Sequence, residues 1–406
     1  MARTIAKPKN NPIRQFSRNP IRGARTWFEN YFLHQSKLFT WLMRLIIFMV
    51  AVGLVMVLSA SNVNSIKNTG DAFAEFKQQL FFAILGLSAM LFISMRSIET
   101  IQKYSRVFFF IALGMQLAVL LPGFGVSVGG NRNWLNLGIA TIQPSEFLKL
   151  GIILVLASLL SPNLDNLWDF ASGAKHVLYW GFVPAFLVLV TAGDLGTAAV
   201  MVSFIFLTMY LIGMPSDKLM LFVGLAVGAL LLAAVFSANR MARILAFLAQ
   251  GTSNVDGADW QVTHGTWALA SGGLFGTGLG ESKMKWGWIP EVENDFIFSI
   301  IGEEVGLIGA VLILFCFFLL AKFIRQVSLN SRTDFGSIAV TGIMLWILVQ
   351  ALVNIAVVLH LFPVLGVPLP LFSKGGSSLL AVMMALGVVL AVEREQAQSK
   401  RRVRSR

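Results

Sequence analysis

An acidic residue marks the point where a long polar loop meets an apolar segment. The loop covers residues 237–295 and ends at Asp295, and the apolar run begins with Phe296. A carboxylate at the edge of hydrocarbon is costly unless it has a function, so we identify Asp295 as the candidate catalytic residue. A structural role is the alternative, because Asn294 or Asp295 could simply cap the helix that follows.

Cations in the same loop could bind a phosphate-bearing ligand. They include Arg240, Arg243 and Lys285, and the acidic residue Glu291 lies nearby in the loop. Guanidinium and ammonium groups at a membrane surface suit the oxygens of a lipid phosphate or diphosphate. We therefore expect these four residues to belong to a substrate-binding site.

Charged residues also lie within apolar segments, where each needs a partner. Glu303 and Glu304 follow Asp295 by eight and nine residues, which along a helix is about 12 Å deeper. Lys149 is a candidate partner for them. Glu146 lies three residues before Lys149 on one helix face, so these two could instead pair with each other or line a polar cavity.

Two shorter loops add candidates for the site. Asp194 follows Gly193 between two apolar runs, where it could be a cavity charge or a plain turn residue. Arg132 and Trp134 lie in a Gly-rich loop. The arginine could bind an anionic headgroup, whereas tryptophan is also typical of a simple membrane-interface anchor.

The last polar loop ends in a glycine pair that precedes another apolar run. The run Ser373-Lys374-Gly375-Gly376-Ser377 reads as the start of a helix. Backbone N–H groups at a helix start can bind an anion, so Ser373, Gly375, Gly376 and Ser377 are candidate substrate ligands. A plain helix cap is the alternative.

Composition indicates an integral membrane protein. Of the 406 residues, 56% are hydrophobic and 13% charged, and the mean hydropathy is +0.74, which leaves too little polar surface for a water-soluble globule. Runs long enough to cross about 30 Å of hydrocarbon as helix recur about ten times. We predict an all-α polytopic fold with spans near Leu45–Ala60, Leu80–Met95, Val107–Leu121, Pro144–Leu160, Val177–Thr191, Ala198–Gly213, Leu219–Phe236, Phe296–Leu320, Ile338–Leu359 and Ser377–Val392.

The positions of the cations indicate topology. The formal charge of +12 could suggest nucleic-acid binding, but most of the 32 Lys and Arg fall where ten spans would place the termini and one set of loops. The positive-inside rule then predicts a cytoplasmic basic arm over residues 1–44, held near anionic membrane lipid, a ten-helix domain over 45–393 and a cytoplasmic basic tail over 394–406. Residues 237–295 become a large extracytoplasmic loop between the seventh and eighth spans.

Several other functions are not supported by the sequence. No cleavable signal peptide is expected in the basic N-terminal arm. The single Cys316 lies within a span and can form no intramolecular disulfide. His264 and His360 lack ligand spacing, so no resident metal site is predicted.

The motifs in their order and spacing resemble the SEDS family of shape, elongation, division and sporulation proteins. The resemblance extends from the first span to Arg394. It rests on Gln143-Pro144-Ser145-Glu146 with Lys149, Asp194-Leu195-Gly196-Thr197, Gly278-Leu279-Gly280, Pro290-Glu291, Asn294-Asp295-Phe296-Ile297-Phe298, Gly302-Glu303-Glu304 and Gly375-Gly376-Ser377-Ser378.

The resemblance implies a ten-helix peptidoglycan glycosyltransferase in the cytoplasmic membrane. Its substrate would be lipid II, an undecaprenyl-pyrophosphoryl disaccharide-pentapeptide that is polymerised outside the membrane. The family's essential acid falls on Asp295, its loop tryptophan on Trp134, and its fourth-span acid and lysine on Glu146 and Lys149. A class B penicillin-binding protein, the FtsI-type transpeptidase, and other divisome proteins are implied as partners.

The residues suit this reaction. Asp295 could act as general base for the acceptor 4-hydroxyl as it attacks the anomeric carbon of the donor. The departing diphosphate needs positive charge, which Arg132, Arg240, Arg243 or Lys285 could supply, as could a divalent cation such as Mg²⁺ or Mn²⁺. A single inversion converts the α-linked donor into a β-linked strand, so one base is enough.

Two subfamilies match different parts of the chain. Residues 55–61, the basic arm and residues 300–304 resemble FtsW, the septal division type, which we favour. Residues 363–370 are closer to RodA, the elongation type. The chain also departs from the family, because Glu293-Asn294 stands where His-Thr is usual and Lys374 replaces a common tyrosine.

Two other functions compete with polymerisation. A flippase that transports lipid II would use charges at the bilayer midplane, usually within repeated halves. The four charges within predicted spans fit this idea, but no repeat is visible, and the concentration of motifs in outward loops favours chemistry there. A non-catalytic scaffold that recruits the transpeptidase is the other alternative.

Overall fold

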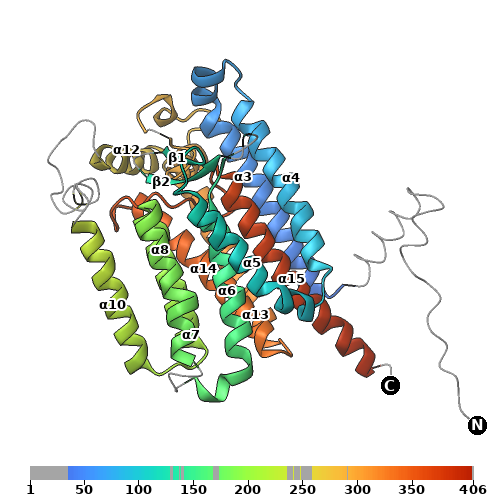
Figure 1. Cartoon of the computed structure of the whole chain (residues 1–406). Coiled ribbons are helices and arrows are strands. Elements are labelled where there is room, and N and C mark those ends of the chain that lie inside the picture. Colours follow the sequence, from blue (N-terminus) through green and yellow to red (C-terminus); the bar gives the residue numbers. More distant parts are fainter. Residues whose placement is uncertain are drawn as a thin grey trace, which may run out of the picture.

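Long apolar helices run side by side in the computed structural model, which describes residues 35–128, 131–136, 138, 141–167, 173–235, 241, 247, 258–289 and 291–404 (Figure 1). The long helices are α3 (Lys37–Thr69), α4 (Ala74–Ser94), α5 (Ile98–Ala118), α6 (Pro144–Leu160), α8 (Val183–Ala192), α9 (Leu195–Leu211), α10 (Ser216–Val235), α13 (Ile297–Leu329), α14 (Asp334–Val358) and α15 (Gly376–Arg404). Shorter helical pieces are η1 (Ser161–Asn166), α7 (Lys175–Val177), η3 (Leu178–Phe182), α12 (Ala258–Ser271) and η4 (Met284–Trp286).

Each predicted span overlaps one of these helices or, for the fifth, the continuous helical segment formed by α7, η3 and α8. Among the described residues, 6 helical segments are both long and apolar enough to cross a membrane, and two shorter apolar helices accompany them. The predicted fold class is confirmed, while the count of ten crossings stays a prediction.

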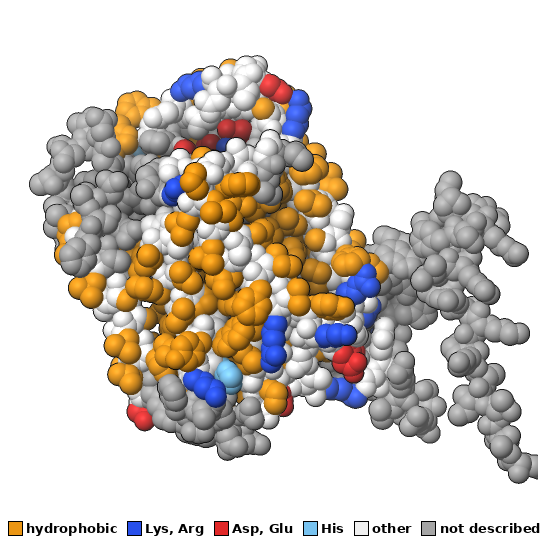
Figure 2. All heavy atoms as spheres, viewed as in Figure 1, with side chains coloured by type: hydrophobic (Ala, Val, Ile, Leu, Met, Phe, Trp, Pro, Cys, Tyr) orange, Lys and Arg blue, Asp and Glu red, His pale blue; other side chains and the backbone are white. Residues whose placement is uncertain are grey.

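The two C-terminal helices and α6, in which nearly every residue is buried, form the centre of the bundle. Within the apolar stretch of α14, 72% of the residues are buried in the protein, and in α15 the share is 83%, against 39% in α3 and 28% in α4. The outer helices expose large apolar side chains, which form the hydrophobic surface in Figure 2. So extensive an apolar surface requires surrounding hydrocarbon.

Helix boundaries follow local signals. The hydroxyl of Ser36 accepts a hydrogen bond from the Phe39 N–H and caps α3, and Ser97 caps α5 in the same way. Helix α6 begins at Pro144, the residue predicted from the sequence, because proline is tolerated in the first helical turn. The polar ends of these helices thereby satisfy backbone groups that the bilayer could not.

A small antiparallel sheet covers one end of the bundle. Strands β1 (Gly125–Val128), β2 (Asn131–Asn136) and β3 (Thr141–Ile142) pair in that order, with Leu135 of β2 opposite Ile142 of β3. The sheet lies on the same side as α12 (Figure 1). It was not predicted from the sequence, where this segment was interpreted as an outer loop.

The glycine run after α12 packs directly onto α13. A Cβ added to Gly272 would collide with the carbonyl oxygen of Gly302, and one on Gly276 with the carbonyl oxygen of Glu304. At Gly306 the helix is interrupted, with φ 75° and ψ −170°. These glycines therefore allow the loop to lie against the first turns of α13.

Candidate functional site

A polar cavity of about 540 Å³ lies on the side of the bundle that carries α12 and the sheet. Its walls come from α4, the β2–α6 region, the start of α9, the loop before α13 and the segment between α14 and α15. The lining residues are Glu75, Gln78, Gln79, Phe82, Asn133, Trp134, Thr141, Gln143, Asp194, Gln261, Glu291, Asn294, Asp295, Phe296, Val364, Leu365, Gly366, Pro368, Lys374, Gly375, Gly376 and Ser378.

Asp295 lines this cavity and is partly exposed. The N-cap residue of α13 is Phe296, and no side-chain cap hydrogen bond is formed there. Asp295 is therefore not the N-cap residue of this helix. The Asp295 backbone carbonyl accepts a hydrogen bond of 2.8 Å from the Asn354 side chain, which fixes the local backbone. Gly366, at φ +69°, adjoins the carboxylate, because an added Cβ would lie 3.6 Å from Asp295 Oδ2.

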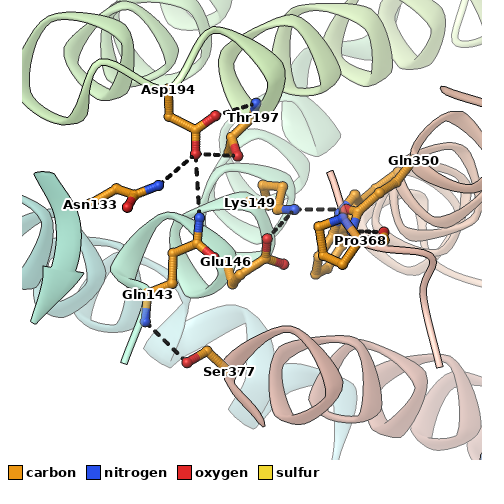
Figure 3. A network of polar contacts seen from close by, with 10 residues as sticks. Asn133, Gln143, Glu146, Lys149, Asp194, Thr197, Gln350, Pro368 and Ser377 are labelled. Carbon is orange, nitrogen blue, oxygen red and sulfur yellow. Dashed lines mark hydrogen bonds and ion pairs between the residues drawn. The ribbon is translucent and has the colours of Figure 1, made fainter. Parts of the chain in front are cut away.

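Asp194 forms another wall and is both a helix cap and a cavity charge (Figure 3). Its Oδ1 accepts a hydrogen bond from the Thr197 N–H at 2.9 Å, which caps α9. Its Oδ2 accepts from the side chains of Asn133 at 3.0 Å and Gln143 at 3.3 Å. The carboxylate thereby joins the sheet, α6 and α9, which the sequence did not predict.

The start of α15 forms the opposite side of the cavity. Gly375, Gly376 and Ser378 line it, whereas the Ser377 hydroxyl accepts a hydrogen bond of 3.0 Å from the Gln143 N–H. Ser373 is buried, and its Oγ accepts from the Leu369 N–H at 2.8 Å. Ser373 and Ser377 therefore hold the backbone that shapes the site.

Two further predicted substrate-binding residues line the cavity. Trp134 of β2 is partly buried, and Glu291 is exposed. Glu291 has φ 47°, a conformation that is uncommon outside glycine, and its carboxylate accepts a hydrogen bond of 2.9 Å from the Asn294 side chain. Both residues stay candidates for contact with substrate.

Lys374 brings a cation to the cavity wall. Its Nζ lies 3.0 Å from Glu75 Oε2 and 3.5 Å from Glu293 Oε1. Burial raises the pKa of the Glu293 carboxyl, while the Lys374 charge and a hydrogen bond from Asn64 act in the opposite direction. This group joins α3 and α4 to the loop before α13.

Glu146 and Lys149 form a closed pair within α6 (Figure 3). Lys149 Nζ donates to Glu146 Oε1 at 2.9 Å and to Gln350 Oε1 at 2.7 Å, and it lies 5.0 Å from the Trp346 ring centre. Both charged side chains are 1% exposed. The mutual ion pair predicted as one alternative is thus present, and neither residue lines the cavity described above.

The partner predicted for Glu303 and Glu304 was wrong. Lys149 is held by α6 and α14, whereas Glu304 Oε1 lies 3.4 Å from Lys285 Nζ and accepts a 2.7 Å hydrogen bond from Ser59. Glu303 accepts hydrogen bonds from the Ser282 hydroxyl at 2.5 Å and the Lys283 N–H at 2.9 Å. The glycine-rich loop folds back onto α13 and brings these groups together.

Of the other expected cations, the two that the structure describes do not line the cavity. Lys285 is 2% exposed and donates to the Gly280 carbonyl as well as pairing with Glu304, so it is not available for a substrate phosphate. Arg132 donates to the Leu121 carbonyl at 3.0 Å and stays outside the lining. Arg240 and Arg243 lie outside the described residues.

Several cavity residues were missed by sequence reasoning. Gln79 donates to the Ser373 carbonyl and accepts from the Gly375 N–H, both at 3.2 Å. Asn133, Gln143 and Lys374 also line the site. The amide side chains in or next to apolar segments were the one sequence signal for these residues, because a buried amide needs hydrogen-bond partners. Among the described residues, no group of three or more His, Cys, Asp or Glu is placed to hold a metal ion.

The fold and cavity together define a multi-pass membrane protein with a carboxylate-lined polar site at one end of its helices. Residues 40–398 match the family described as "Cell cycle protein", FTSW_RODA_SPOVE. The chain therefore belongs to this family, and the SEDS resemblance is confirmed.

Curated relatives agree with this membership. "Stage V sporulation protein E" of Bacillus subtilis is 38% identical over 347 residues, which cover 85% of this chain and 94% of the relative. Proteins named "Probable peptidoglycan glycosyltransferase FtsW" from Trichlorobacter lovleyi and Coxiella burnetii are 33% and 34% identical. They cover 86% and 87% of this chain and 92% and 96% of their own lengths, and their names favour the FtsW type over the RodA type.

Solved structures share the fold. One described as "Structural coordination of polymerization and crosslinking by a peptidoglycan synthase complex" matches with TM-score 0.68 and 27% identity, covering 87% of this chain and 97% of that chain. The rod shape determining protein RodA of Thermus thermophilus matches with TM-score 0.63 and 27% identity, covering 87% and 96%.

Proposed function

We propose that this chain is a peptidoglycan glycosyltransferase that polymerises lipid II into glycan strands. The observation that carries the proposal is the Asp295 carboxylate, which lines a cavity of about 540 Å³. Relatives of the chain over nearly its whole length are named peptidoglycan glycosyltransferases. A polar cavity at the end of an apolar bundle suits a substrate with a sugar–diphosphate head and a hydrocarbon tail.

The reaction needs one base and a stabilised leaving group. Asp295 takes the proton of the acceptor 4-hydroxyl while that oxygen forms a bond to the anomeric carbon of the donor. The bond from this carbon to the diphosphate oxygen breaks, and its electron pair leaves with undecaprenyl diphosphate. The displacement inverts the anomeric centre. Positive charge from the protein or a divalent cation stabilises the departing diphosphate.

The distribution of basic residues supports a proposal for which side of the membrane the cavity faces. Helix α4 begins beside the cavity at Ala74 and ends at Ser94, so Arg96, Lys103 and Arg106 lie towards the opposite end of the bundle. The positive-inside rule puts that end in the cytoplasm, together with both termini. The cavity then opens outside, where glycan strands are built.

The relatives support a proposal for the partner and the place of action. A structural neighbour belongs to a complex described as combining polymerisation and crosslinking. We propose a class B penicillin-binding protein as the crosslinking partner and, from the FtsW-type relatives, a site at the division septum with other divisome proteins. A role in elongation is the alternative, because RodA shares the fold.

The test compares wild type with Asp295→Ala and the isosteric Asp295→Asn. Purified full-length protein with its transpeptidase partner should convert lipid II to polymer on a gel. Both variants should lower the rate by roughly 10²- to 10⁴-fold, because neither side chain can accept the proton. Thermal unfolding, followed by dye labelling of the single buried Cys316, should be unchanged. If both variants still polymerised lipid II, Asp295 would not be the catalytic base.

Two other outcomes identify the competing functions. If no polymer forms but fluorescent lipid II crosses reconstituted vesicles, the chain is a flippase. If cells carrying Asp295→Ala as their only copy divide normally, the chain acts as a scaffold for the transpeptidase.

A further inference from the structure

The cavity is strongly acidic for a site that must accept a diphosphate. Four carboxylates line it, those of Glu75, Asp194, Glu291 and Asp295. Lys374 is the one lysine or arginine in its lining as far as the described residues go. A diphosphate entering this cavity meets more negative than positive charge, so its binding depends on where that single cation lies.

The ammonium of Lys374 is shared between two carboxylates. Its Nζ lies 3.0 Å from Glu75 Oε2 and 3.5 Å from Glu293 Oε1. The Lys374 side chain is 25% exposed, against 3% for that of Glu293. An ammonium has three protons and Lys374 has two carboxylate partners, so a ligand in the cavity can still receive a hydrogen bond from it.

The backbone around Lys374 is fixed, in contrast to its side chain. The Lys374 N–H donates to the Glu293 carbonyl at 2.9 Å. The Gln79 side chain forms hydrogen bonds with the backbone on both sides of Lys374, donating to the Ser373 carbonyl and accepting from the Gly375 N–H. The side chain can therefore change its partner without a change in the chain path.

The start of α15 adds a second positive contribution. Gly375 and Gly376 line the cavity directly after Lys374, and α15 runs for 29 residues from Gly376. The first N–H groups of a helix have no intrahelical acceptor, and the helix dipole is positive at that end. An anion beside Lys374 would meet this end of the helix as well.

We propose that Lys374 is a substrate-positioning residue that binds the diphosphate of the lipid-linked donor. Its ammonium pairs with Glu75 and Glu293, and it exchanges these carboxylates for phosphate oxygens when the donor enters. Lys374 has this role only if the chain polymerises a diphosphate-linked sugar, as proposed above.

The direct test measures diphosphate binding to purified full-length protein. Titration with inorganic pyrophosphate should show binding about 10- to 100-fold weaker for Lys374→Met than for wild type, because a charge-assisted contact is lost. Lys374→Arg should bind within a few-fold of wild type. Glu75→Gln should bind more tightly, because it removes a competing carboxylate. Equal binding by wild type and Lys374→Met, or no binding by wild type, would overturn the proposal.

Charge balance provides the control for folding. Lys374→Met leaves two carboxylates without their cation, so the protein could unfold for that reason alone. The double variant Glu75→Gln with Lys374→Met restores part of the balance and should melt near the wild-type temperature. It should still bind pyrophosphate at least 10-fold more weakly. Recovery of wild-type affinity in the double variant would contradict a direct contact.

Competition experiments distinguish the diphosphate of the lipid-linked donor from the phosphate of ordinary membrane lipids. Nanodiscs containing undecaprenyl diphosphate should compete with pyrophosphate in wild type and much less in Lys374→Met. Competition by phosphatidylglycerol alone, lost in the same variant, would assign the contact to bulk lipid and overturn the proposal.

Steady-state kinetics separate this inference from the proposed function. Lys374→Met should raise the KM for lipid II about tenfold or more, with a smaller change in kcat, and Lys374→Arg should restore it. An unchanged KM would remove the role of Lys374 and leave the polymerase intact. Lys374-dependent diphosphate binding without any polymer from wild type would remove the polymerase and leave the binding site.

Discussion

Two acidic regions lie within ten residues of each other at the start of α13, and they have opposite surroundings. Asp295 lines an open polar cavity and is partly exposed. Glu303 and Glu304 are 1% and 2% exposed, and their oxygens are taken up by Ser59, Ser282 and the cation of Lys285. Within one segment, a carboxylate is thus placed once towards a space that a substrate could fill, and two others lie within the packed interior.

The difference teaches how to separate chemistry from structure in this fold. A buried carboxylate with complete partners strengthens packing and cannot act on a substrate, because its lone pairs are already used. A carboxylate that lines a cavity can be reached by a substrate. The substitutions below test whether this separation holds, and they complement the expected loss of activity in Asp295→Ala.

The largest effect on stability is expected from Glu304→Ala. This change leaves the ammonium of Lys285 buried without its ion-pair partner, which typically destabilises a protein by about 3–5 kcal/mol. Thermal unfolding in detergent, read by dye labelling of Cys316, should shift to a clearly lower temperature. The exposed Glu281 of the same loop is the matched control, and Glu281→Ala should melt like wild type. A wild-type melting temperature for Glu304→Ala would show that the buried pair is not structural.

An intermediate loss of stability is expected from substitution of Asp194, which lines the cavity but is also buried and hydrogen-bonded. Asp194→Ala removes the cap of α9 and leaves the amides of Asn133 and Gln143 without an acceptor, a loss of about 1–3 kcal/mol. Asp194→Asn keeps an oxygen for the cap and should lose less. Melting temperatures of the two variants provide the measurement, and equal values would argue against the capping role.

The smallest effect concerns Glu293 and its pH dependence. Burial raises the pKa of this carboxyl in the folded state, so ionisation costs more in the folded than in the unfolded protein, and the neutral form is the one that contributes to stability. The stabilising contribution of that form is fully present below the unfolded-state pKa and is lost as the pH rises through the folded pKa. Glu293→Gln should therefore melt slightly higher than wild type at pH 8 and equally at pH 4. A lower melting temperature for the variant at pH 8 would contradict the sign.

Much of the fold could be predicted from sequence because hydrophobic length is a local property. A single apolar run of about 20 residues has to be helical in a bilayer, because only a helix satisfies all of its backbone hydrogen bonds within the run itself. The predicted start of α6 at Pro144 and the position of Asp295 just before α13 rest on such local signals. The small sheet was missed because its strands are short and its pairing depends on neighbours.

The composition of the cavity was decided by contacts between distant segments. Gln79 meets Ser373 and Gly375 across nearly 300 positions of sequence, and Glu75 meets Lys374. No local pattern distinguishes Lys374, which faces the cavity, from Lys285, which is buried against Glu304.

The sequence by itself determined that the chain is a helical membrane protein of the SEDS family and that an acid stands at the end of its large loop. Only the tertiary structure decided which charges neutralise one another and which remain beside open space. The physical reason is that apolar spans are specified by their own composition, whereas an ion pair forms wherever packing brings its two members together.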